Sequence, residues 1–202
     1  VKDGRVTIKS GNKKAVLVSL LCETDFVAKN EDFATLLNNL AEEALKNGVE
    51  KMKAGAKDMI DQIIQKTGEN IQLGEVYEVT GDVLESYLHN NKIGVIVSLE
   101  GGSAELAKDI AMHIAAMKPE YIYADEVSEE ARKTMQEVFE KEVAGIDKPE
   151  EIKKKMLDGK LATYFKEKTL IEQPFIKDGD MTVGRLLETK GAKIKEVKRY
   201  SI

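Results

Sequence analysis

The stretch AVLVSLLCETDFVAKN, residues 15–30, joins an apolar strand pattern to the start of a helix. Its first seven residues form a nearly continuous apolar run, which is typical of a strand covered on both faces. Asn30 is a good helix N-cap, and the two acidic residues after it favour a first helical turn. Between strand and helix, Asp25 lies beside Phe26 in a connection. Connections lie on the surface and carry function, so this ring needs either a core to fold back onto or a partner to enter.

The same pattern occurs a second time in the chain. Val16-Leu17-Val18-Ser19-Leu20 aligns with Val95-Ile96-Val97-Ser98-Leu99, and the same offset pairs Asn12-Lys13 with Asn91-Lys92. In each copy a turn cluster precedes the apolar strand, which predicts a β-hairpin, and a helix pattern follows. We therefore expect an α+β fold with two related subdomains, each a small antiparallel sheet with helices on one face.

The helices of the first copy are predicted from their apolar periodicity. One helix after Asn30 has five apolar residues on a single face, namely Phe33, Leu36, Leu37, Leu40 and Ala44. Lys53-Ala54-Gly55 then indicates a weak joint. A second, short helix is expected after it, ending at Gly68.

Residues 125–168 have a different pattern from the rest of the chain, with narrow apolar stripes among many charged residues. Two charged amphipathic helices on a short loop predict an antiparallel helical hairpin of the coiled-coil kind. The last strand, 194–202, does not alternate cleanly, so we expect a bulge and a return to the second sheet. The predicted organisation is residues 1–81 as one subdomain, 82–124 with 169–202 as the other, and 125–168 as an inserted hairpin.

Composition places the chain among globular proteins. It has 202 residues, of which 42% are hydrophobic and 33% charged. No apolar run approaches the roughly 18 residues of a membrane span. The net charge of −5 gives no basic footprint of the kind that nucleic-acid binders show. A single cysteine excludes an internal disulfide and suits a reducing compartment.

Signatures of covalent chemistry are absent from the sequence. There is no GxxxxGK[ST] phosphate loop and no glycine-rich dinucleotide fingerprint after a strand. Nothing in the sequence indicates that the fold brings the two histidines, His89 and His113, together with Cys22 as a metal site. No carboxylate pair stands out as a general acid and base. We therefore predict no catalytic residue, no cofactor and no metal.

Several of these residues also have an ordinary structural interpretation. Cys22, which follows an apolar run, is most simply a buried small hydrophobe. His113 lies at the edge of an apolar helix face and is interpreted as a partly buried helix histidine. Asp25 could accept hydrogen bonds in a turn, and Phe26 could act as a hydrophobic staple for the helix that follows.

Residues 22–30 closely resemble the signature of the bacterial-type elongation factor Ts family. Further matches follow in the family's order and cover essentially the whole chain. They are Lys66-Thr67-Gly68-Glu69-Asn70-Ile71, Gly81-Asp82-Val83, Lys92-Ile93-Gly94-Val95, Ala111-Met112-His113-Ile114-Ala115-Ala116, Lys118-Pro119, Gln173-Pro174-Phe175 and Thr182-Val183.

The resemblance implies a guanine-nucleotide exchange factor for elongation factor Tu, in the cytoplasm or in an organelle stroma or matrix. It implies a core of two three-stranded antiparallel subdomains with an inserted hairpin, without the helical ubiquitin-associated-like domain that precedes this core in the family. Thr67 stands where many members carry an apolar residue. The partner-binding residues that the resemblance implies are Thr24, Asp25, Phe26, Val27, Gly68, Glu69, Asn70 and His113.

Two other functions remain open from the sequence. One is a scaffold that forms a homodimer through the helical hairpin, without any effect on nucleotide release. The other is a hydrolase with a carboxylate pair that no motif reveals, which would show turnover and perturbed acids in a pocket.

Overall fold

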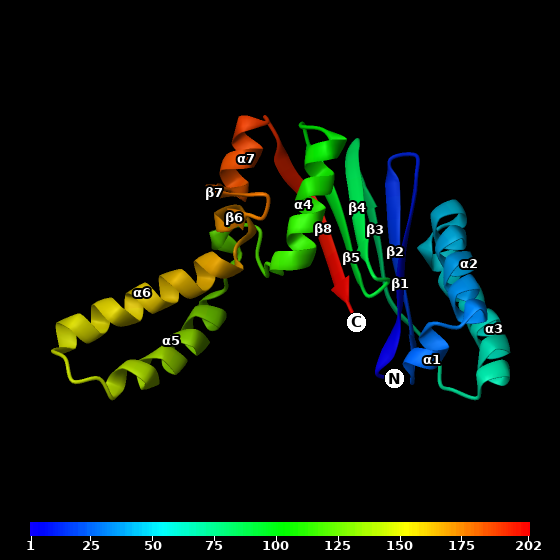
Figure 1. Cartoon of the computed structure of the whole chain (residues 1–202), viewed down its shortest axis with the longest axis horizontal. Coiled ribbons are helices and arrows are strands. Elements are labelled where there is room, and N and C mark those ends of the chain that lie inside the picture. The colour runs from blue at the N-terminus through cyan, green and yellow to red at the C-terminus, as the bar shows by residue number, and fades with distance from the viewer. The chain divides into compact units, whose positions relative to one another are not determined.

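The structure, a computed structural model, describes all 202 residues and divides into two compact units. The first unit is formed by residues 1–116 and 190–202, and the second by residues 117–189. Two three-stranded antiparallel sheets, ordered β1-β2-β3 and β4-β5-β8, lie in the first unit (Figure 1). Its elements are β1 (Asp3–Gly11), β2 (Lys14–Cys22), α1 (Asp25–Ala28), α2 (Glu31–Asn47), α3 (Val49–Thr67), β3 (Gln72–Thr80), β4 (Val83–His89), β5 (Ile93–Glu100), most of α4 (Ala104–Met117) and β8 (Lys193–Ser201).

Strand β2 is the centre of the first sheet and is buried on both faces. Val16, Val18 and Leu20 belong to the core that β2 shares with helices α2 and α3. Leu17 belongs instead to a second core, which lies between the two sheets. Successive side chains of a strand point to opposite faces, so a strand between two cores has to be apolar at almost every position. The prediction of a strand covered on both faces is confirmed.

Helix α2 begins where the sequence predicts. The side-chain oxygen of Asn30 accepts hydrogen bonds from the backbone N–H groups of Asp32, at 2.8 Å, and Phe33, at 3.4 Å. These bonds satisfy donors that the first turn of a helix leaves without partners. All five predicted apolar residues of this helix are buried.

Helix α3 corrects the prediction of a weak joint at residues 53–55. The helix runs unbroken over 19 residues from Val49 to Thr67. Gly55 faces open space and therefore costs only helix propensity, about 1 kcal/mol relative to alanine. Four apolar side chains on one face, Met52, Ala56, Ile60 and Ile63, are buried along the whole length of the helix. Their burial outweighs the local cost of the glycine.

The two central strands repeat each other in detail. Ser19 in β2 and Ser98 in β5 are both fully buried. The hydroxyl of Ser19 donates to the Glu75 carbonyl at 2.9 Å, and that of Ser98 donates to the Thr80 carbonyl at 3.0 Å. Each central strand therefore satisfies its one buried polar residue through a backbone carbonyl, as buried hydroxyls require.

Strand β8 completes the second sheet beside β5. Ser98 pairs with Glu196 and Leu99 with Ile194, so Lys195 is the extra residue of a bulge. The predicted bulge and the predicted return to the second sheet are both confirmed.

The two sheets pack face to face through a core that includes Val6, Leu17, Val79 and Ile96. Helices α2 and α3 cover the outer face of the first sheet, and α4 lies along the second (Figure 1). The first unit is therefore layered helix, sheet, sheet, helix, and the predicted α+β fold is confirmed.

The second unit contains the predicted helical hairpin. Helix α5 (Glu129–Ala144) packs on α6 (Glu150–Lys168), with the rings of Phe139 and Tyr164 edge to face at 5.7 Å. The remaining elements are the 3₁₀ turns η1 (Ala124–Glu126) and η2 (Leu170–Glu172), the short strands β6 (Pro174–Phe175) and β7 (Asp178–Thr182), and α7 (Val183–Thr189). None of the helices in the chain is both long enough and apolar enough to cross a membrane. The subdomain boundaries predicted from the sequence stay a prediction.

Candidate partner-binding site

The single-turn helix α1 follows directly from the end of strand β2. Thr24 is its N-cap, because the Thr24 hydroxyl oxygen accepts the N–H of Val27 at 3.4 Å. The thiol of Cys22 donates to the carbonyl of Thr24 at 3.2 Å. These bonds fix the chain between the strand and the helix.

Phe26 projects from α1 into solvent. Its side chain is 83% exposed, whereas the next two residues, Val27 at 8% and Ala28 at 3%, are buried in the first core. Because these neighbours anchor the turn, the ring stands on a fixed base and is left largely uncovered by its own chain. The interpretation of Phe26 as a staple for the next helix is therefore wrong.

Asp25 is exposed at the first position of α1. Its carboxylate pairs with the Lys29 ammonium at 3.3 Å, and both side chains are more than half exposed. Such a pair contributes little to stability. The role of turn acceptor, which the sequence left open for Asp25, belongs to Thr24 instead.

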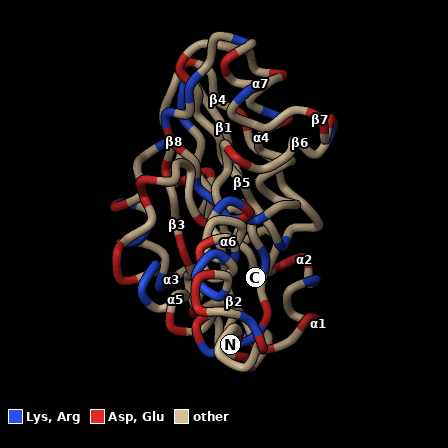
Figure 2. Tube along the Cα trace, turned by 90° about the vertical axis from the view of Figure 1, so that its left-hand side faces the viewer, with Lys and Arg blue, Asp and Glu red and all other residues tan.

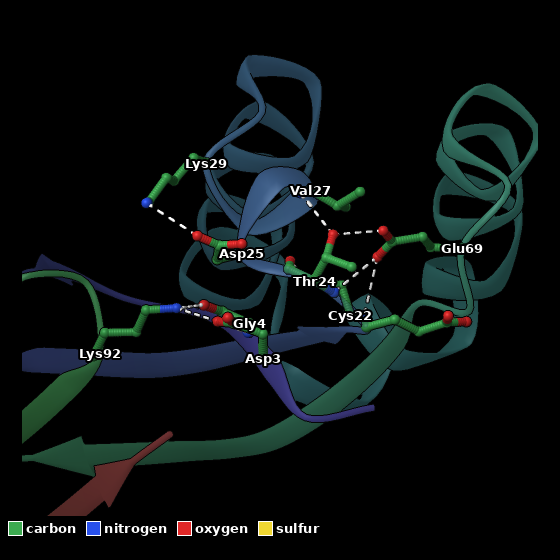
Figure 3. A network of polar contacts seen from close by, with 10 residues as sticks. Asp3, Gly4, Cys22, Thr24, Asp25, Val27, Lys29, Glu69 and Lys92 are labelled. Carbon is green, nitrogen blue, oxygen red and sulfur yellow. Dashed lines mark hydrogen bonds and ion pairs between the residues drawn. The ribbon is translucent and has the colours of Figure 1, made fainter.

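A second loop, between α3 and β3, lies against the Phe26 loop (Figure 3). Helix α3 ends at Gly68, whose φ of +72° is left-handed and whose N–H donates to the Ile64 carbonyl at 2.8 Å. The carboxylate of Glu69 then accepts the N–H groups of Glu23, at 3.0 Å, and Thr24, at 3.1 Å.

The contact between the two loops is reciprocal. The Thr24 hydroxyl also donates to the Glu69 carboxylate, at 2.5 Å. In return the carboxylate of Glu23 accepts the N–H of Asn70 at 2.8 Å. The structure thus brings together seven of the eight residues predicted to bind a partner, those of the stretches 24–27 and 68–70.

Comparison with known proteins identifies the family of this chain. A family model described as Elongation factor TS matches residues 23–202. The chain belongs to the elongation factor Ts family. The resemblance seen in the sequence is confirmed, and the matched residues include every predicted site residue.

Three curated relatives named Elongation factor Ts show how far the family similarity extends. The protein of Thioalkalivibrio sulfidiphilus is 40% identical over 98% of this chain and 71% of its own length. That of Hahella chejuensis is 39% identical over 99% of this chain and 72% of its own length. That of Pseudomonas aeruginosa is 39% identical over 98% of this chain and 70% of its own length.

His113, the eighth residue that the elongation factor Ts resemblance implies, is separate from the two loops. It lies on α4 and is fully buried. A buried ring offers no surface to a partner in this conformation, so a role for His113 in binding stays a prediction. Its burial agrees with the ordinary interpretation of a helix histidine.

Two members of the loop network, Cys22 and Glu23, were not predicted as site residues. Burial raises the pKa of the Cys22 thiol to about 11, so this group is a neutral donor and not a nucleophile. Glu23 lies in the stretch 22–30 that resembles the family signature, but its place before the N-cap gave no indication of a partner for its carboxylate. Only the pairing of two distant loops reveals its role.

The chain contains no group of three or more histidine, cysteine, aspartate or glutamate side chains placed to hold a metal ion. Acidic and basic residues are interspersed along the trace (Figure 2). The site is therefore an exposed aromatic ring on a hydrogen-bonded base, which fits insertion into another protein.

Proposed function

We propose that this chain is a guanine-nucleotide exchange factor that binds the GDP form of elongation factor Tu and promotes release of GDP and Mg²⁺ during translation elongation. The exposed Phe26 ring on its anchored turn carries the proposal, together with membership of the elongation factor Ts family. The compartment is then that of the translation machinery, a bacterial cytoplasm or an organelle stroma or matrix.

Exchange requires no covalent chemistry of its own. A protein that binds the nucleotide-free partner better than the GDP form weakens GDP binding by the same factor, because coupling between two ligands is reciprocal. In the proposed mechanism Phe26 inserts between helices of the partner's nucleotide domain near its Mg²⁺ site. Asp25, whose carboxylate is exposed, accepts hydrogen bonds from the partner that fix the turn once it is inserted. The groups that hold Mg²⁺ and the phosphates move as a result, and GDP leaves.

Phe26 supplies only part of the required free energy. Full burial of a phenylalanine side chain contributes about 1.5–3 kcal/mol, which is about one to two orders of magnitude in an equilibrium constant. Larger acceleration needs further contacts. The exposed residues Gly68 and Asn70 beside the Phe26 loop are the candidates that the structure favours.

Release of a fluorescent GDP from elongation factor Tu tests the proposal directly. We expect the parent chain to accelerate release and to bind the nucleotide-free partner more tightly than the GDP form. Gel filtration of the mixture with and without GDP measures the second effect. A complex that forms equally well in both conditions, with unchanged GDP release, would contradict an exchange function.

The helical hairpin supports one alternative, a scaffold that dimerises through α5 and α6. Val138 and Ile152 on these helices are 43% and 44% exposed. A dimer of this kind would appear as a doubled mass that Ile152→Asp reduces to the mass of one chain. If the chain were only such a scaffold, GDP release from elongation factor Tu would be the same in the presence of the parent chain, in the presence of Ile152→Asp and without either.

A further inference from the structure

The Glu69 carboxylate is held by three donors, all from the segment that precedes Phe26 (Figure 3). One oxygen accepts the N–H groups of Glu23 and Thr24, and the other accepts the Thr24 hydroxyl at 2.5 Å. A carboxylate with these partners has little capacity left for a group on another protein. Glu69 therefore faces its own chain and not the partner.

The Thr24 hydroxyl connects this carboxylate to α1. Because the hydroxyl donates its only proton to Glu69, its lone pairs are directed toward the N–H of Val27, at 3.4 Å. Val27 is the residue directly after Phe26 and is buried in the core. The orientation of the turn that carries the ring thus depends on a hydrogen bond that Thr24 donates to a loop 45 residues further along the chain.

The base of the Glu69 loop is also fixed. The backbone N–H of Glu69 donates to the Thr67 hydroxyl at 3.3 Å, and that hydroxyl donates to the Ile63 carbonyl at 2.9 Å. Thr67 therefore links the Glu69 loop to the last turn of α3. A continuous set of hydrogen bonds runs from this long helix to the single-turn helix that presents Phe26.

We propose that Glu69 is a positioning residue, which holds the Phe26 turn in its binding orientation before any partner arrives. This inference rests on the proposed exchange function and deepens it. A single turn of four residues has almost no stability of its own, because helix nucleation is unfavourable. Holding the turn in advance reduces the entropy that binding would otherwise cost. The acidic pair Glu23 and Glu69 thus acts through Phe26.

Mobility of the Phe26 turn tests this inference without any partner. A nitroxide attached to Phe26→Cys reports the motion of α1, and Cys22, which is fully buried, remains unlabelled. We expect Glu69→Ala to narrow the electron paramagnetic resonance lines of this label. Glu42→Ala, which removes an exposed carboxylate from α2, is the matched control and leaves them unchanged. Unchanged lines in Glu69→Ala would overturn the inference, whatever the exchange assay shows.

A double-mutant cycle in the GDP-release assay tests whether Glu69 acts through the ring. Loss of hydrogen bonds to a partly buried carboxylate should slow stimulated release about tenfold in the parent chain. The same Glu69→Ala change should have no effect when Phe26→Ala is already present, because there is no ring left to position. Equal losses in both backgrounds would mean that Glu69 contacts the partner itself, which would overturn the inference.

Folding of the variants is checked by thermal unfolding. Glu69→Gln keeps an acceptor oxygen for the N–H groups of Glu23 and Thr24. We therefore expect this variant to retain most of the stimulated GDP release that Glu69→Ala loses, and to retain the broad electron paramagnetic resonance lines of the label. A Glu69→Gln chain that folds and behaves like Glu69→Ala would contradict positioning by these hydrogen bonds. If the parent chain does not accelerate GDP release at all, the proposed function fails, and the label mobility alone decides the role of Glu69.

Discussion

Truncation of Phe26 to alanine removes the exposed ring without disturbing the fold. Full burial of a phenylalanine contributes about 1.5–3 kcal/mol, and 83% of this side chain is exposed in the free chain. Binding can therefore still gain about 1.2–2.5 kcal/mol from the ring, which corresponds to about one to two orders of magnitude. We expect stimulated GDP release to fall by this factor in Phe26→Ala.

The assay is stopped-flow release of a fluorescent GDP from elongation factor Tu over a range of chain concentrations. Phe26→Leu keeps much of the apolar area and should lie between the parent and Phe26→Ala. Ile152→Ala truncates an apolar side chain of the helical hairpin that is 44% exposed, and we expect it to leave release unchanged. The melting temperature should be the same in all of these chains, because the truncated side chains are exposed.

Two results would refute the role of Phe26. Unchanged release in Phe26→Ala would show that the ring does not enter the partner. A melting temperature that falls together with the release rate would show that the ring supports the fold of its own chain, against its exposure in the structure.

Three further predictions concern the stability and reactivity of the fold. The hydrogen bond from Lys92 lowers the pKa of Asp3 below its usual value, so the stability that this bond contributes is fully present above the pKa of an unfolded aspartate and is lost as the pH falls through the lowered pKa. Asp3→Asn should lower the free energy of unfolding by about 1 kcal/mol at pH 7, after allowance for solvent screening. In urea denaturation at a series of pH values, the free energy of unfolding of this variant should fall less steeply in acid than that of the parent chain, and an equally steep fall would contradict the prediction. Gly94→Ala should destabilise the chain by about 1–3 kcal/mol in urea denaturation, because its Cβ would come within 2.8 Å of the Leu17 side chain between the sheets; a neutral result would mean that the Leu17 side chain moves aside easily. The Cys22 thiol, with its pKa of about 11, should react with a thiol reagent at pH 7 only as fast as the chain unfolds, whereas rapid labelling of the folded chain would contradict its burial.

Local sequence patterns predicted most of the secondary structure. Three predicted features are present in the structure: the cap at Asn30, the apolar face of α2 and the hairpin that ends in each central strand. Each of them depends on residues that are neighbours in the sequence. The weak joint predicted at Gly55 was wrong for a physical reason. A glycine costs a helix about 1 kcal/mol, and burial of the apolar face along α3 exceeds that cost. Local propensity carries no information about such burial.

The sequence by itself determined the α+β fold, its internal repeat, its family and the placing of Phe26 in a connection. Those features depend on periodicity and on motifs, both of which are local. Only the tertiary structure decided that Phe26 is exposed and that Glu69 faces its own chain. The reason is that the Glu69 contacts join segments about 45 residues apart, and that the exposure of Phe26 follows from the packing of Val27 and Ala28 into the core. Whether an aromatic side chain packs inward or points outward, and which donors a carboxylate meets, is settled when distant loops come together.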